Sequence, residues 1–171
     1  MILKPDLTKL AVSSDDFAAI GAELLGGGSA LRFTARGSSM HPLVRDGDTL
    51  LIRPRQPESI SAGDIVLCET DAGRLLVHRV IRRRVEEDGV HFLIQGDQVA
   101  DPDGWIPAMR VHGRLEEIER QGRCLDVTET SPRLLGFLLV LAQRMDQRNS
   151  KLAFLVSGLI RRLPVFWKYL R

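Results

Sequence analysis

The stretch GSSMHPLVRDGDTLLI, residues 37–52, decides the fold because it joins a serine-rich turn to an apolar strand through a second turn. Gly37 and Gly47 are typical turn residues, and TLLIR at 49–53 has the composition of a β-strand. Immediately before this stretch, apolar and polar residues alternate through LRFTAR, residues 31–36, with the period of a half-buried strand. The sequence therefore predicts two strands joined by a loop that carries adjacent serines.

Further β-rich runs continue the pattern downstream. They are DIVLC, LLVHRVI, VHFLIQ and RVHGRL, and they are separated by turns such as SAGD, TDAG and EDG. Short strands at this spacing are typical of an antiparallel sheet or barrel, so we predict a mainly β fold.

The segments on either side of the β-rich region have helical patterns. Residues 1–28 form an N-terminal helical segment whose helix, over 13–25, presents one apolar stripe: Phe17, Ile20, Gly21, Leu24 and Leu25. Residues 131–171 predict a basic, amphipathic helical hairpin. At 171 residues the chain has the size of one domain, and we place the β-rich domain at 29–130.

The charge of the C-terminal tail differs from that of the rest of the chain. The net charge is +2, but residues 131–171 hold eight Lys or Arg against one acid, which is +7 and leaves 2 − 7 = −5 for residues 1–130. Two interpretations stay open. The tail either lies on an anionic membrane surface through its basic and aromatic residues (Arg161, Arg162, Phe166, Trp167, Lys168, Tyr169 and Arg171), or packs on the sheet or on a protein partner.

Several classes of protein are disfavoured by the composition. The arginines at 82–84 are followed by three acids at 86–88, which favours a solvated hairpin and predicts no nucleic-acid partner. His41, His91 and His112 are interpreted as surface residues, and we expect neither a metal site nor a cofactor. Two cysteines without redox spacing indicate a reducing compartment. Without a secretory signal or about 18 consecutive apolar residues, the prediction is a cytoplasmic or peripheral membrane protein.

A serine in the 37–42 turn could act as a nucleophile only beside a base. Lysine occurs only at positions 4, 9, 151 and 168, which excludes a serine–lysine dyad within the β-rich core. His78, in the apolar run LLVHRVI, is the best candidate base. The loop QGDQVADPDGW supplies three carboxylates that could orient its ring: Asp97, Asp101 and Asp103.

Taken together, GSSMHPLVRDGDTLLI, AGDIVL, LLVHRVI and IQGDQVADPD resemble the successive sequence boxes of the clan that joins type I signal peptidases with self-cleaving SOS repressors. The resemblance implies a signal-peptidase-like β-rich fold with Ser39, the serine before methionine, as nucleophile. The box HRV resembles the endoplasmic-reticulum and archaeal branch, which implies a histidine base, His78. By the same resemblance Asp103 is the acid and Asp97 holds the loop.

Two features depart from the signal peptidases. Gly37 stands where they usually have a serine that helps to bind the oxyanion, so backbone amides at Ser39 and its neighbours, with Ser38, are expected to take that role. The sequence also predicts no N-terminal membrane anchor. The resemblance implies a serine endopeptidase that cuts a leader or signal-like peptide. The alternatives are a catalytically silent, membrane-associated module that binds peptides or proteins, and a self-cleaving regulator.

Overall fold

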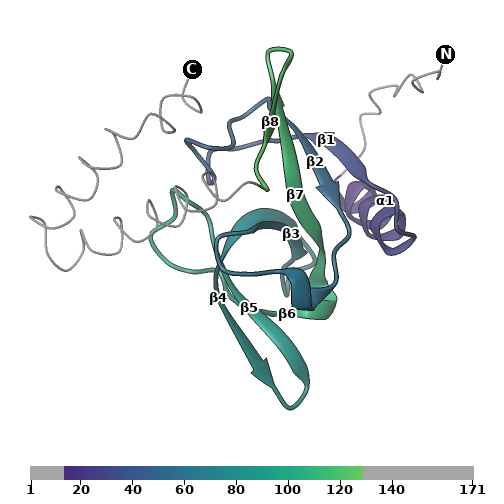
Figure 1. Cartoon of the computed structure of the whole chain (residues 1–171), viewed down its shortest axis with the longest axis vertical. Coiled ribbons are helices and arrows are strands. Elements are labelled where there is room, and N and C mark those ends of the chain that lie inside the picture. The colour runs from purple at the N-terminus through teal and green to yellow at the C-terminus, as the bar shows by residue number, and fades with distance from the viewer. Residues whose placement is uncertain (1–13, 129–171) are drawn as a thin grey trace, which may run out of the picture.

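The computed structural model describes residues 14–128, which form one short helix followed by an eight-stranded antiparallel sheet (Figure 1). The elements are α1 (Ser14–Gly26), β1 (Leu31–Thr34), β2 (Thr49–Arg53), β3 (Ile65–Glu69), β4 (Leu75–Glu86), β5 (Gly89–Gln95), β6 (Gly104–Pro107), β7 (Val111–Arg120) and β8 (Arg123–Asp126). Two single-turn 3-10 helices, Pro57–Ser59 and Ala108–Arg110, lie in the connections. The prediction of a mainly β fold with a leading helix is therefore confirmed.

The strands do not follow one another across the sheet in chain order. The order is β1-β2-β7-β3-β4-β5-β6, with β8 paired to β7, so β7 enters between β2 and β3. Register shifts interrupt the β2–β7, β3–β7 and β4–β5 ladders, and such bulges bend strands. The β4–β5 and β7–β8 hairpins project at opposite ends of the molecule (Figure 1).

Strand β3 is buried on both faces, and the hydrophobic core is divided accordingly. Ile65 and Leu67 belong to one cluster of buried apolar residues, whereas Val66 and Cys68 belong to another. Successive residues of a strand point to opposite faces, so a single strand serves both clusters. This double burial explains why IVLC, residues 65–68, is an uninterrupted apolar run rather than an alternating one.

Helix α1 packs against the first cluster through a narrower stripe than predicted. Phe17, Gly21 and Leu25 are half-buried or buried, and the ring of Phe17 lies edge-on to that of Phe33 at 5.0 Å between centroids. Ile20 and Leu24 are instead exposed. The inward-facing residues are spaced by four, the i, i+4, i+8 line of a helix, and the prediction for Ile20 and Leu24 was wrong.

The predicted strands are present, and two further strands accompany them. The alternation of residues 31–36 is confirmed, because Leu31 and Ala35 are buried whereas Arg32, Thr34 and Arg36 are exposed. Strand β4 continues through the three arginines to Glu86. Strands β6 and β8, which the sequence analysis did not predict, add short pairings to β5 and β7.

The predicted helical hairpin at 131–171 lies outside the described residues, as do residues 1–13. The division into segments 1–28, 29–130 and 131–171 therefore stays a prediction. Among residues 14–128, no helix combines the length and the apolar character that a membrane span requires.

Candidate active site

The serine-rich turn lies in the loop between β1 and β2, and its backbone is fixed by hydrogen bonds. Gly37 has a φ of 91°, a left-handed conformation that favours glycine, and its N–H donates to Asp46 Oδ1 at 2.9 Å. The next residues differ in burial: Ser38 is exposed, Ser39 is half-buried, and Met40 is buried in the core. Met40 therefore anchors the turn and leaves Ser39 at the boundary between core and solvent.

A partly buried ion pair supports the same loop from β7. Arg120 donates from Nε to Asp48 Oδ1 at 2.8 Å and from Nη2 to Asp48 Oδ2 at 2.6 Å. Arg120 Nη2 also donates to the carbonyl oxygen of Leu43 at 2.8 Å. A guanidinium that binds both a carboxylate and a carbonyl fixes two points of one loop, so β7 restrains the segment that carries Ser39.

His78 projects from the middle of β4 and is only 5% exposed. Its Nε2 lies 2.9 Å from Ser39 Oγ, and its Nδ1 lies 2.6 Å from Asp103 Oδ2. One imidazole ring therefore joins a hydroxyl and a carboxylate that are far apart in the sequence.

The two contacts define which nitrogen carries the proton. A neutral imidazole has one N–H, and an ionised carboxylate can only accept hydrogen bonds. His78 Nδ1–H therefore donates to Asp103, and Nε2 accepts the hydrogen bond that the Ser39 hydroxyl donates. This is the arrangement in which a histidine can take the proton of a serine.

The three candidate carboxylates have different environments. The side chain of Asp103 is 22% exposed and contacts His78, whereas Asp101 is exposed and contacts neither Ser39 nor His78. Asp97 is 1% exposed and accepts two hydrogen bonds from Arg79, at 2.7 and 2.6 Å. Asp97 therefore does not contact the ring of His78, and Asp103 does.

Consecutive residues of β4 hold the two ends of the loop that carries these acids. Arg79 binds Asp97 at the start of the loop and donates to the Gly63 carbonyl at 2.8 Å. His78 binds Asp103 at the end of the loop, where the Asp103 N–H donates to the Ile94 carbonyl. Because neighbouring residues of a strand point to opposite faces, the two contacts do not compete.

The acidic loop also binds the serine turn directly. The Gln98 N–H donates to the Ser39 carbonyl at 2.7 Å, and its side-chain amide donates to the His41 carbonyl at 3.2 Å. A Cβ placed on Gly96 would lie 2.9 Å from the Ser39 carbonyl oxygen and 3.1 Å from His78 Nε2. Glycine at position 96 is thus what allows the loop to approach the serine and the histidine this closely.

The backbone amides near Ser39 differ in whether their N–H groups donate hydrogen bonds. Gly37 uses its N–H to bind Asp46, and His41 donates to the Ser38 carbonyl. No hydrogen bond within residues 14–128 engages the N–H of Ser38 or of Ser39. Gly37 therefore shapes the turn, while these two amides, like that of Met40, are available donors beside the hydroxyl.

The cysteines offer no rival nucleophile at this site. Burial raises the pKa of Cys68 to about 12, and the nearby Asp103 carboxylate contributes to the rise. At that pKa the thiol is protonated near neutrality and is a poor nucleophile. Cys124 lies on β8 and is exposed.

The remaining histidines are not equivalent. His41 is exposed, as predicted, and His112 is half-buried. His91 is buried, so its interpretation as a surface residue was wrong. It lies near the turn of the β4–β5 hairpin beside Glu86 and Asp88.

Some residues of the site were missed from sequence. The Asp48–Arg120 pair, Gly96 and Gln98 hold the two loops in place, yet none was assigned that role. The sequence did contain a signal, because the pair Gly-Asp occurs three times, at 47–48, 63–64 and 96–97. In the structure all three aspartates are buried. A buried aspartate needs a partner, so the repeated pair predicts structural ion pairs.

Comparison with known proteins places the chain in a family. A family model described as Peptidase S24-like matches residues 7–102, which is more than half of the chain. The matched range includes Ser39 and His78 and ends one residue before Asp103. No curated protein matches the chain. The chain belongs to the Peptidase S24-like family.

Proposed function

We propose that this protein is a serine endopeptidase in which Ser39 is the nucleophile, His78 the general base and acid, and Asp103 the residue that orients His78. The observation that carries the proposal is the bridging ring of His78, 2.9 Å from Ser39 Oγ and 2.6 Å from Asp103 Oδ2. Residues 10–150 contain no lysine, so the described site has no lysine base. A histidine base accords with the branch that the HRV box resembles.

In the first half of the reaction, Ser39 Oγ attacks the carbonyl carbon of the scissile peptide bond while its proton passes to His78 Nε2. The resulting imidazolium is stabilised by the Asp103 carboxylate at Nδ1. The negative charge that develops on the carbonyl oxygen is stabilised by the N–H of Ser39, together with that of Ser38. Collapse of this intermediate breaks the C–N bond, and His78 returns the proton to the leaving amine.

The second half releases the acyl group. Water attacks the Ser39 ester while His78 Nε2 takes its proton, and the proton then returns to Ser39 Oγ as the carboxylic product leaves. At the end of the cycle Ser39 and His78 have their original protons, and one water molecule has been consumed.

The proposed substrate is an extended peptide paired with an open edge of the sheet. Within the described residues, β1 pairs only with β2 and β6 only with β5, and the two edge strands adjoin the site. β1 leads into the loop of Ser39, while β6 begins directly after Asp103. Backbone pairing at such an edge recognises extended peptides. By resemblance, we propose a leader or signal-like segment with small side chains near the cut.

Cleavage of a peptide library by the full chain tests the proposal. We expect Ser39→Ala, and His78→Ala to a comparable degree, to lower kcat/KM by about a thousandfold or more. Ser38→Ala is the matched control, because it removes the adjacent hydroxyl but keeps the backbone amide. It should retain cleavage within about tenfold.

Two outcomes would favour the alternatives. Correctly folded wild type that cuts no peptide, with or without lipid, would favour a silent peptide-binding module. Wild type that cuts only its own chain, while the Ser39→Ala variant stays intact, would favour a self-cleaving regulator.

The location of the protein is a separate part of the proposal. The basic and aromatic residues of 131–171 support binding to an anionic membrane surface. Flotation with anionic liposomes should therefore be reduced in an Arg161→Glu, Arg162→Glu variant of the full chain. Equal recovery of both proteins with neutral and anionic liposomes would contradict membrane binding.

A further inference from the structure

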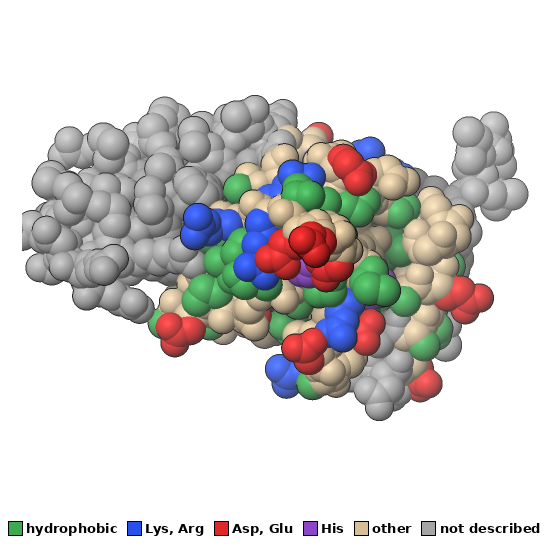
Figure 2. Space-filling view, turned by 90° about the horizontal axis from the view of Figure 1, so that it is seen from below, with side chains coloured by type: hydrophobic (Ala, Val, Ile, Leu, Met, Phe, Trp, Pro, Cys, Tyr) green, Lys and Arg blue, Asp and Glu red, His purple; other side chains and the backbone are tan. Residues whose placement is uncertain are grey.

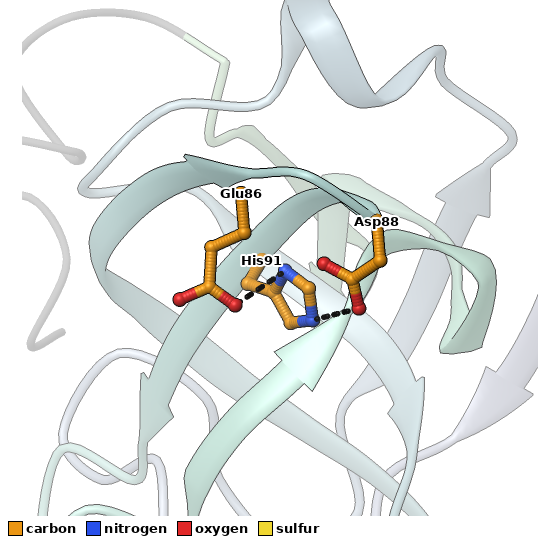
Figure 3. Close-up of side chains that lie close together, drawn as sticks. All are labelled: Glu86, Asp88 and His91. Carbon is orange, nitrogen blue, oxygen red and sulfur yellow. Dashed lines mark ion pairs between the residues drawn. The ribbon is translucent and has the colours of Figure 1, made fainter.

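Three possible metal ligands converge near the turn of the β4–β5 hairpin, away from the serine. Glu86 ends β4, Asp88 lies in the turn, and His91 follows on β5 (Figure 3). One ligand atom from each lies within 4.8 Å of the other two. On the face seen in Figure 2, acidic side chains gather around a histidine, with basic and apolar side chains beside them.

Each ring nitrogen of His91 lies near the carboxylate of a different acid. Its Nδ1 lies 3.4 Å from the Gly89 carbonyl oxygen and 3.7 Å from Glu86 Oε2, so this nitrogen faces two acceptors. In a neutral imidazole with its single proton on Nδ1, the lone pair of Nε2 faces Asp88 Oδ2 at 3.5 Å. A cation between these two atoms, either a second ring proton or a metal ion, removes their repulsion.

The spacing of these two atoms suits a bound metal ion. Two ligands of a tetrahedral zinc ion, each about 2.1 Å from the metal, lie about 3.4 Å apart. The 3.5 Å between His91 Nε2 and Asp88 Oδ2 is close to that separation. It is also longer than an ordinary hydrogen bond.

Glu86 and water could supply the other ligands of the metal ion. Arg84 Nε binds Glu86 Oε1 at 2.8 Å, which leaves Glu86 Oε2 directed toward His91. The guanidinium of Arg84 is itself held 3.9 Å above the ring of Trp105. The Glu86 and Asp88 side chains are 41% and 71% exposed, so water can reach a fourth position.

We propose that Glu86, Asp88 and His91 bind a divalent transition-metal ion of the zinc class, with one ring nitrogen of His91 and one oxygen of each carboxylate as ligands. An imidazole with two carboxylates favours zinc, nickel or copper over magnesium, which prefers oxygen ligands alone. Eight residues of extended strand, roughly 25 Å, separate Glu86 from His78, so this site is distinct from the serine site. The ion would tie the turn to β5 and stabilise the hairpin whose strands carry His78 and lead to Asp103.

Calorimetric titration of the tag-free full chain with zinc chloride tests this site. We expect one ion per chain at micromolar zinc, and affinity at least about tenfold weaker in each of Glu86→Gln, Asp88→Asn and His91→Gln. His112→Gln is the matched control, since His112 Nε2 also lies 3.5 Å from a carboxylate, that of Glu69, but has no second acid in the group. It should bind zinc like the wild type.

Amide NMR spectra of the wild type locate the ion without relying on any variant. Zinc should shift resonances of residues 84–92 and leave those around Ser39 unchanged. No binding at micromolar zinc would overturn the proposal. So would binding that His91→Gln leaves unaltered, or shifts centred on His78.

Discussion

Ser39, His78 and Asp103 lie on three separate parts of the chain, and neighbouring residues hold each of them in place. Asp48 and Arg120 restrain the loop of Ser39, whereas Arg79 and Asp97 fix the start of the loop that ends at Asp103. Of the proposed reacting groups, Ser39 and Asp103 are partly open to solvent, whereas His78 is 5% exposed. Their supports are ion pairs with little exposure to solvent. Changing a support should therefore affect folding, and changing a reacting group should affect catalysis.

Asp97→Asn and Asp103→Asn should separate these two effects. Asp97→Asn leaves the Arg79 guanidinium, which is 0% exposed, without its anionic partner and should lower the free energy of unfolding by about 3 kcal/mol. Asp103→Asn should leave stability within about 1 kcal/mol of the wild type but lower kcat by about a hundredfold or more, because His78 loses its acceptor. Denaturant unfolding and peptide cleavage measure the two effects. Equal loss of stability in both variants would contradict the division of roles.

Gly96→Ala tests the close contact between the acidic loop and the serine turn. The new methyl group would lie 2.9 Å from the Ser39 carbonyl oxygen and 3.1 Å from His78 Nε2, so the loop must move. We expect a loss of about 1–3 kcal/mol in stability and a fall in kcat. Gly26→Ala, at the end of α1 with open space around it, is the control and should behave like the wild type in unfolding and cleavage assays. Unchanged activity in Gly96→Ala would show that the contact is dispensable.

At the scale of the elements, one kind of turn begins two of the central strands. In the turns before β2 and β3, a glycine with positive φ precedes an aspartate, Asp48 or Asp64. In each turn the aspartate N–H donates to the carbonyl three residues earlier, and the carboxylate accepts the N–H of that same residue. β7 then presents an arginine to each aspartate, Arg120 and Arg114. The turns therefore depend on the position of β7 in the sheet.

Asp48→Asn should reveal this dependence. It removes the charge that pairs with Arg120, whose side chain is 15% exposed, so we expect unfolding to become easier by about 2–3 kcal/mol. Because Arg120 also binds the Leu43 carbonyl, the loop of Ser39 should loosen as well. Hydrogen exchange of residues 37–48 measures the loosening. Exchange at wild-type rates in this segment would contradict a role for β7 in holding the serine loop.

Local sequence patterns predicted most of the helices and strands but few of the contacts between them. The alternating run at 31–36 and the apolar runs of β2 to β5 were sufficient to predict strands. GWIP and RCLD were not, because Gly, Pro and charged residues are typical of loops, and only pairing to β5 and β7 makes them strands. The interpretation of His91 failed for the same reason, since its burial depends on the hairpin around it.

For the candidate site, the order of the sequence motifs was a better guide to the candidate residues than composition. Ser39 and His78 were chosen from their boxes, and Asp103 was preferred over Asp97 and Asp101 because its spacing resembles that of the histidine branch. The structure brings the three chosen side chains into contact. The contacts of Gly96 and the pairing of Arg120 with Asp48 could not be predicted, since they arise from strand order rather than local sequence.

At the scale of the whole molecule, the sheet joins two hydrophobic clusters that share β3. Cys68 lies in the second cluster with 0% exposure, and Cys124 is exposed on β8. These are the only two cysteines of the chain, so the reactivity of Cys68 reports on the folding of the second cluster, with the exposed Cys124 as an internal reference.

A thiol reagent should modify one cysteine in the native protein and two in denaturant. With its pKa raised to about 12 by burial, Cys68 has too little thiolate at pH 8 to react, and the reagent cannot reach it. Burial and a hydrogen bond donated to Glu117 raise the pKa of Cys124, so its labelling should be faster at higher pH. Ellman's reagent provides the measurement, with Cys124→Ser as control. Rapid native labelling of Cys68 would contradict the buried second cluster.

The central claim is that the ring of His78 activates Ser39. The most direct test treats the full chain with a fluorophosphonate and determines the modified residue by intact-mass and peptide mass spectrometry. The account predicts a single adduct on Ser39, formed by the wild type and by Ser38→Ala but lost in His78→Ala. An adduct on another residue, or equal labelling of Ser39 in the wild type and in His78→Ala, would contradict it.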